Sequence, residues 1–206
     1  DRMDPNAFPP FEPAHYNYIH QLAAGGQFRP GVAAENVPAG VPAGLAAVHH
    51  GAAWNDLAGV ARLFELLPGQ IAAVCVAAGY ADMAAGKTFY PGLRELTRRH
   101  GALLIYDEIV TGFRIALGGV QEYFGVTPDL AVFAKGVANG MPLSVFCGRR
   151  DLMSLCDRGG KAVISSTYGG EALSLAAAQA TTGVYRSQNV IAHLWHQGET
   201  MWQGLN

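Results

Sequence analysis

The sequence predicts an α/β fold, a mostly parallel sheet with helices on both faces. Four short runs of mainly apolar residues, 70–78, 102–108, 128–135 and 142–148, show no polar–apolar alternation. Strands that are apolar on both sides are buried on both sides, which is typical of parallel sheets. Segments with helical spacing stand between and after these runs, and such an order favours the α/β class.

Three segments are predicted to be helices. Residues 55–69 have apolar side chains at spacings of three and four, an N-cap candidate in Asn55, and a Pro-Gly stop. Residues 90–101 end in a glycine, and residues 170–188 are rich in alanine. We expect the remainder of the chain to continue as helix.

The chain divides into three predicted parts. Residues 1–54 are rich in Pro, Gly, Ala and His, and we expect a loop-rich entry segment that contains a long loop over residues 29–47. Residues 55–186 form the α/β core. We expect residues 187–206 to be a helix that leads toward a further, C-terminal domain, so the sequence is interpreted as a fragment of a larger protein.

Composition excludes several classes of function. Half of the 206 residues are apolar and the net charge is −2, which provides a large core and argues against a nucleic-acid partner. No apolar run approaches the ~18 residues of a membrane span. Cys75 and Cys147 lie in apolar runs, and we expect buried free thiols in a reducing, cytoplasmic compartment. The histidines show no metal-ligand pattern, and no metal site is predicted.

Two polar residues stand at the ends of predicted strands. Asp107 ends one apolar run and Lys135 ends the next, and ligands of open α/β sheets bind at the carboxyl ends of strands. A lysine desolvated there by Val132 and Phe133 would have a lowered pKa and would be nucleophilic, as Schiff-base chemistry requires. The alternative is a lysine that extends into solvent from a strand end.

A carboxylate at a neighbouring strand end suggests a cofactor. Asp107 could hydrogen-bond a protonated ring nitrogen, and a Lys Schiff base with such an Asp partner indicates pyridoxal 5'-phosphate (PLP). Alone, Asp107 could instead be a turn former, and Lys135 could serve a lyase or aldolase that needs no PLP. Glu108 is predicted to be structural, in a salt bridge with Arg114.

Four stretches in order carry a family resemblance. "LLIYDEIVTGFR", "GGVQEYFGVTPDL", "DLAVFAKGVANGMPLSVFCGRRDLM" and "SSTYGGEALSLAAA" resemble the class III PLP-dependent aminotransferases, and among them the glutamate-1-semialdehyde aminomutase-like group. The resemblance implies the large domain of a fold-type I transferase, with residues 55–186 as its PLP-binding core. It also implies a homodimer with shared active sites.

The resemblance implies a role for each matching residue. Lys135 would hold PLP as a Schiff base and then move the proton between substrate and cofactor. Asp107 would bind the pyridine nitrogen, and Ile109 would pack under the ring. Thr167 would bind the cofactor phosphate of the other subunit. The residues around Thr167 agree with this, because a hydroxyl and a Gly-rich turn before a helix N-terminus predict an anion site, although a simple turn or N-cap is the alternative.

The sequence departs from the family pattern at two places. The family usually has "YHG" where this chain has "HYN", so either His15 or Tyr16 would stack on the cofactor ring. Ala77 and Ala78 stand where the family usually has glutamate and proline. The loss of that carboxylate suggests a different substrate pocket.

The predicted function is that of an aminotransferase which moves an amino group from a small-molecule amino donor to a keto or aldehyde acceptor. A glutamate-1-semialdehyde-type aminomutase is an alternative. The wording "GGEALSL" departs from the "SGNPLAM" style of the aminomutases and favours the aminotransferase. A degenerate homologue that binds PLP without turnover is an alternative of another class.

Overall fold

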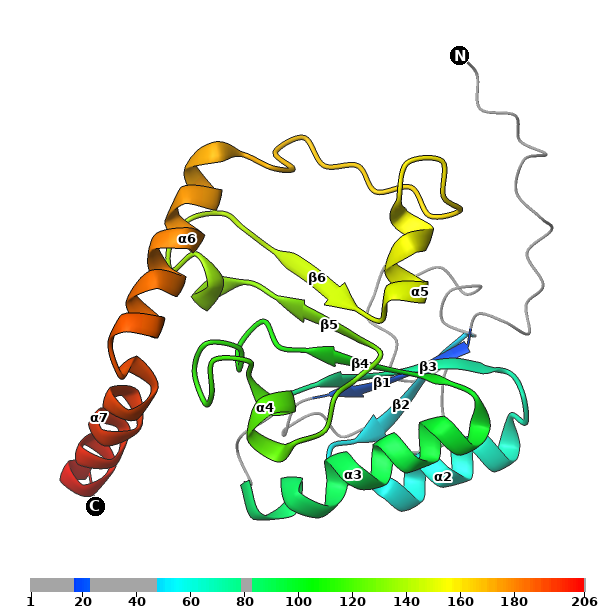
Figure 1. The fold of residues 1–206 in the computed structure, drawn as a ribbon. Coiled ribbons are helices and arrows are strands. Elements are labelled where there is room, and N and C mark those ends of the chain that lie inside the picture. The colour runs from blue at the N-terminus through cyan, green and yellow to red at the C-terminus, as the bar shows by residue number, and fades with distance from the viewer. Residues whose placement is uncertain (1–16, 23–47, 79–82, 206) are drawn as a thin grey trace, which may run out of the picture.

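A computed structural model describes residues 17–22, 48–78 and 83–205. Its centre is a six-stranded sheet with the strand order β2-β1-β3-β4-β5-β6 (Figure 1). Neighbouring strands are parallel except for the β5–β6 pair, which is antiparallel. The predicted mostly parallel sheet is therefore confirmed. The strands are β1 (Asn17–Leu22), β2 (His49–Ala53), β3 (Ile71–Ala77), β4 (Leu103–Asp107), β5 (Leu130–Phe133) and β6 (Val145–Gly148).

Helices follow the strands as the sequence predicts, although α3 begins seven residues before the predicted start at residue 90. Within the described ranges, no helix is long and apolar enough to span a membrane. The helices are α2 (Leu57–Leu66), α3 (Met83–His100), α4 (Val120–Phe124), α5 (Arg150–Met153), α6 (Ala172–Ser187) and α7 (Val190–Leu205), with two 3₁₀ turns, η2 (Lys135–Val137) and η3 (Ser154–Cys156).

Two strands lie in the segment that the sequence predicts to be loop-rich. β1 and β2 pair in parallel, and β1 also pairs with β3. The β2 sequence, His-His-Gly-Ala-Ala, has neither an apolar run nor alternation, so only pairing with a neighbour reveals it as a strand. The expected loop over residues 29–47 lies outside the described residues.

The N-cap of α2 is Asp56, whereas the sequence suggested Asn55. The Asp56 Oδ1 atom accepts a hydrogen bond of 2.8 Å from the Gly59 backbone nitrogen, whereas Asn55 has a left-handed φ of 68° one position earlier. An N-cap side chain accepts from the amide two or three residues later. Only Asp56 fulfils that geometry here.

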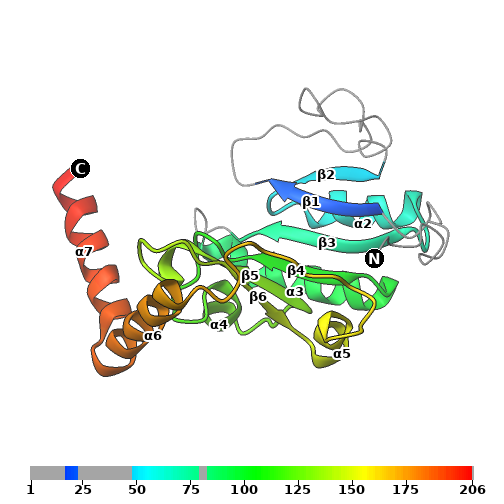
Figure 2. The same ribbon diagram turned by 90° about the horizontal axis from the view of Figure 1, so that it is seen from above.

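The core lies between the sheet and two helices that cover one of its faces (Figures 1 and 2). Its largest fully buried side chains include Phe89, Tyr90 and Leu93 of α3 and Leu104 and Tyr106 of β4. Helices α2 and α3 cover this face. Over β3, β4 and β5, no described helix covers the opposite face, where alternate side chains such as those of residues 103, 105 and 130 stay half-buried.

The cysteines are less buried than the sequence predicts. Cys75 is half-buried on β3, and Cys147 is exposed on β6. All four residues of β6, the strand at one edge of the described sheet, are exposed. An apolar run therefore did not mean burial at this edge of the sheet.

A buried carboxylate ties β4 to β5 at the edge where both strands begin. Asp129 Oδ2 accepts from the Leu104 backbone nitrogen at 2.8 Å and from Arg94 Nη1 at 2.8 Å, and Asp129 Oδ1 accepts from Arg149 Nη1 at 2.9 Å. Burial alone would raise the pKa of Asp129, but these donors outweigh it and hold that pKa below its ordinary value of 3.8. Asp129 is therefore ionised in the folded protein.

The variant Asp129→Asn should lower the free energy of unfolding by about 3 kcal/mol, because it leaves the largely buried Arg94 guanidinium without its counter-ion. Urea denaturation at pH 7 measures this. Asp151→Asn is the matched control, since Asp151 is exposed, shares Arg149 and should matter little. Because the pKa is lowered, the contribution of Asp129 is present above pH 3.8 and is lost as the pH falls below that value. Equal effects of the two variants would contradict the prediction.

Candidate active site

Parallel pairing brings Asp107 and Lys135 to the same edge of the sheet. Asp107, the last residue of β4, pairs with Val132 of β5, and the Glu108 nitrogen donates to the Val132 oxygen at 2.8 Å. Lys135 follows three residues after Val132, as the first residue of η2. This is the carboxyl edge at which the sequence predicts a site.

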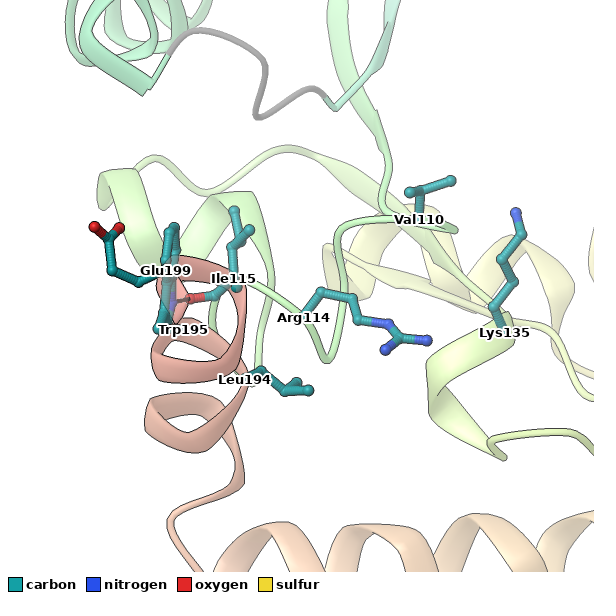
Figure 3. A pocket seen from close by; sticks show the side chains of 8 residues that line it. Val110, Arg114, Ile115, Lys135, Leu194, Trp195 and Glu199 are labelled. Atoms are coloured by element: carbon teal, nitrogen blue, oxygen red, sulfur yellow. Dashed lines mark hydrogen bonds between the residues drawn. The ribbon is translucent and has the colours of Figure 1, made fainter. Parts of the chain in front are cut away.

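Lys135 lines a cavity of about 540 Å³ whose other walls come from the segment after β4 and from α7 (Figure 3). Its backbone is left-handed, with a φ of 46°, which is uncommon for a residue with a side chain. Its side chain is exposed, so the predicted desolvation by Val132 and Phe133 is wrong for the described residues. The amine is instead presented openly to the cavity.

The Asp107 carboxylate is oriented by the backbone that follows it. Asp107 Oδ1 accepts from the Ile109 nitrogen at 3.0 Å, and its other oxygen has no partner among the residues that the structure describes. One Asp107 carboxylate oxygen therefore remains available to a ligand.

Burial and the nearby Asp107 carboxylate raise the pKa of Cys75 to about 11, so this thiol stays protonated at neutral pH.

Ala78 makes a backbone hydrogen bond beside Asp107. The Ala78 backbone nitrogen donates a hydrogen bond to the Asp107 backbone oxygen at 3.1 Å. A proline at this position could not make this bond. The bond extends the β3–β4 pairing to the last residue of β4. Ala78 thus holds the Asp107 peptide in the sheet.

The structure does not bring all predicted site residues together. The cavity lining includes Lys135 and Val110 but neither Asp107 nor Ile109. Thr167 is exposed in the segment before α6 and does not line this cavity either. His15 and Tyr16 lie outside the described residues.

The predicted anion site at the start of α6 is already filled. Glu171 is the N-cap, and its carboxylate oxygens accept from the Leu173 and Ser174 nitrogens at 2.7 and 2.8 Å. Because Glu171 caps α6, Thr167 is not its N-cap. The backbone donors that would attract an anion at this terminus are engaged by the chain's own carboxylate.

Glu108 does not form the predicted salt bridge with Arg114. It is fully buried and accepts hydrogen bonds from the Thr111 hydroxyl, from the Val120 nitrogen at 3.0 Å and from the Gln121 nitrogen at 3.1 Å. These donors lie at both ends of residues 109–119, which connect β4 to α4. Glu108 therefore closes this connection into a loop, which we call the 109–119 segment.

Gly119 makes room for this buried carboxylate. Its φ of 76° suits glycine, and a Cβ atom at this position would collide with the Glu108 carboxylate. Burial raises the pKa of Glu108, although the hydrogen bonds from Thr111, Val120 and Gln121 act to lower it. Sequence reasoning missed this role because the donors are mostly backbone groups 12 and 13 residues away.

The fold and the site define an α/β protein with an amine and a carboxylate at the carboxyl edge of one sheet. The model of the aminotransferase class-III family matches residues 41–206, and the chain belongs to that family. It spans less than two-fifths of two curated relatives, both glutamate-1-semialdehyde 2,1-aminomutases. That of Pelotomaculum thermopropionicum is 40% identical over 158 residues, 75% of this chain and 36% of the relative. That of Roseiflexus castenholzii is 40% identical over 169 residues, which are 80% of this chain and 39% of the relative.

Solved structures share the fold. An omega-transaminase from Sphaerobacter thermophilus superposes with a TM-score of 0.67 at 26% identity, over 83% of this chain and 45% of that protein. The FumI protein of Sphingopyxis sp. MTA144 superposes with a TM-score of 0.77 over 93% of this chain and 47% of that protein, at 24% identity. The sheet and its helices are therefore those of the class III aminotransferase fold.

Replacing Glu108 tests its role in closing the 109–119 segment. Glu108→Ala leaves buried donors unpaired and should lower the free energy of unfolding by about 3 kcal/mol. Because burial raises the pKa of Glu108 above 4.5, the folded protein holds this proton more tightly than the unfolded chain. Stability should therefore fall as the pH rises from 4.5 through the raised pKa, and Glu108→Gln should remove that decline.

The measurement is urea denaturation of the protein and of its Glu108→Gln variant at a series of pH values. Glu122→Gln is the matched control, because Glu122 is exposed and also accepts from the segment, at 2.6 Å from the Gly118 nitrogen. If the free energies of unfolding of the protein and of Glu108→Gln differ by the same amount at every pH, the raised pKa assigned to Glu108 is refuted.

Proposed function

We propose that the protein is a PLP-dependent aminotransferase that uses Lys135 to form a Schiff base with its cofactor. The observation that carries the proposal is the Lys135 amine, presented to a cavity at the carboxyl edge of the sheet in a chain of the class III aminotransferase family. The substrates would be a small-molecule amino donor and a keto or aldehyde acceptor.

The donor groups on the chain fit PLP. Lys135 offers a primary amine for the cofactor aldehyde, and Asp107 offers a carboxylate oxygen that no described residue occupies. When bound, PLP supplies an electron sink for the charge that develops on the substrate carbon. Asp107 would hold a proton on the ring nitrogen, and the half-buried Ile109, whose backbone nitrogen fixes Asp107, would pack under the ring. Released Lys135 would move the proton at the substrate carbon.

Thr167 supports a shared site between two subunits. Residues 157–170 are exposed throughout, and Thr167 lies away from the cavity of its own chain. In the proposed homodimer, the Thr167 hydroxyl would contact the phosphate of the cofactor bound in the partner subunit. With the α6 amides engaged by Glu171, this contact would rest on the hydroxyl and on nearby loop backbone.

An aminomutase is the second candidate, and the curated relatives favour it. Both relatives reported above are glutamate-1-semialdehyde 2,1-aminomutases at 40% identity. An aminotransferase releases a keto product and then takes its amino group from a second substrate. An aminomutase keeps the amino group within one substrate and returns it to a neighbouring carbon. The Lys135 and Asp107 chemistry serves both outcomes.

Borohydride reduction of the full-length gene product with PLP should attach a pyridoxyl group to Lys135, because reduction makes a Schiff base permanent. Peptide mass spectrometry after digestion locates the label. The chain has only two other lysines, Lys87 and Lys161, both exposed, and these serve as internal controls. A label on either control lysine, or none at all, would leave the non-catalytic homologue as the better account.

The two candidate reactions differ in their products. An aminotransferase should convert an amine and a keto acid into a new carbonyl compound and a new amino acid, and a Lys135→Ala variant should slow turnover by about 10²-fold or more. An aminomutase should convert glutamate 1-semialdehyde into its amino-shifted isomer without any acceptor. Chromatography of both mixtures separates the outcomes, and product from the semialdehyde alone would replace the first candidate by the second.

A further inference from the structure

Two aromatic residues from later in the chain hold the middle of the 109–119 segment. The Tyr185 hydroxyl of α6 donates to the Phe113 backbone oxygen at 2.7 Å, and the Trp195 indole nitrogen of α7 donates to the Ile115 backbone oxygen at 3.0 Å. We call these two contacts the anchoring hydrogen bonds. The hydrogen bonds to Glu108 lie at the two ends of the segment, so the anchoring hydrogen bonds add support to its middle.

The backbone at the first of these contacts is strained. Phe113 has a left-handed φ of 62°, which is uncommon for a residue with a side chain. Such a conformation persists where its surroundings determine it, and it is found more often at functional sites. The Phe113 ring lies edge to face with the rings of Tyr185 and Phe133, at centroid distances of 5.7 and 6.2 Å. Tyr185 therefore supports Phe113 through both its ring and its hydroxyl.

The backbone that is held in this way forms part of the wall of the cavity. Val110, Arg114 and Ile115 of the segment line the cavity, whereas Tyr185 does not. Figure 3 shows Trp195 of α7 beside Ile115 at the same cavity. In the described part of the chain, the Arg114 side chain makes no ion pair or hydrogen bond, so it does not hold the segment itself.

The reactive amine belongs to a different element from this wall. Lys135 is the first residue of η2, and neither anchoring hydrogen bond reaches η2. The distance between the wall and the Lys135 amine therefore depends on how the 109–119 segment is held against α6 and α7. Loss of an anchoring hydrogen bond would move the wall and leave the amine in place.

We propose that Tyr185 and Trp195 are positioning residues of the active site, which set the place of the cavity wall relative to Lys135, an inference that rests on the proposed function. A ligand whose carbon body lies along the wall depends on that placement. A ligand that consists of little more than an amino group does not. Small errors of placement are costly, because a reacting group must lie within about 3–3.5 Å of its target.

Hydrogen exchange tests the anchoring hydrogen bonds directly. The amides of residues 112–115 all donate to backbone oxygens within or next to the segment. In the PLP-loaded full-length protein, Tyr185→Phe and Trp195→Phe each remove one donor and should speed exchange of these amides about 10-fold. Tyr123→Phe is the matched control, because the Tyr123 hydroxyl makes no hydrogen bond in the described chain and its ring still stacks on Trp195. Unchanged exchange in both test variants would overturn the proposal.

The reactivity of the bound cofactor tests the consequence for the site. Hydroxylamine and O-benzylhydroxylamine both displace Lys135 from its Schiff base, and the cofactor absorbance reports the rate. Tyr185→Phe should slow the benzyl compound about 10-fold and leave hydroxylamine unchanged, because only the benzyl compound has an apolar body that reaches the wall. Tyr185 does not line the cavity, so a direct contact does not explain such a difference. A general loss of structure would change both rates alike, and equal changes would overturn the proposal.

The remaining outcomes separate this proposal from the proposed function. If borohydride leaves Lys135 of the unaltered protein unlabelled, the proposed function fails, and the exchange rates still decide whether Tyr185 and Trp195 hold the segment. A labelled Tyr185→Phe protein with faster exchange and an unchanged rate for the benzyl compound would overturn the role at the cavity. If both variants fail to fold, the unaltered protein decides, since unprotected amides at residues 112–115 would contradict the anchoring hydrogen bonds.

Discussion

The parallel pairing of β4 with β5 is the constraint on which the site depends, because it determines where Asp107 and Lys135 lie. Each end of the pair is secured by a buried acid. Asp129 binds the backbone nitrogen of Leu104 where the strands begin, and the Asp129 nitrogen donates back to the Leu104 oxygen at 2.8 Å. Glu108 holds the connection that leaves β4 at the other end. A shift of one residue in this register would move Asp107 to the other face of the sheet.

The buried carboxyl groups of Asp129 and Glu108 have different hydrogen-bond partners. Burial would raise the pKa of Asp129, but the Leu104 backbone amide and two arginines together hold it below the ordinary value. Glu108 is buried among neutral donors, a hydroxyl and two backbone amides, so burial dominates and its pKa is raised. Paired cations favour the charged form more strongly than neutral donors do. Ionisation of Asp129 therefore stabilises the edge where β4 and β5 begin. At the carboxyl edge, the raised pKa means that Glu108 ionises with more difficulty.

The sequence alone predicts the central strands and most helices, because apolar runs and helical spacing are local properties. It does not reveal β2, whose residues become a strand only through pairing with β1. The partner of Glu108 could not be predicted either, since an ion pair with Arg114 at six residues' distance looks as plausible as backbone amides twelve residues away. The exposure of Lys135 likewise depends on how η2 turns away from the strand.

The freedom of Arg114 follows from the burial of Glu108. An ion pair between these two side chains would engage the guanidinium that now lines the cavity. Instead Thr111 and the start of α4 satisfy Glu108, and Tyr185 and Trp195 hold the backbone on either side of Arg114. Because those two donors belong to α6 and α7, the position of Arg114 is coupled to both helices. α7 also contributes Leu194, Trp195 and Glu199 to the cavity wall, so the hydrogen bond from Trp195 to the Ile115 oxygen fixes the 109–119 segment and that wall relative to each other.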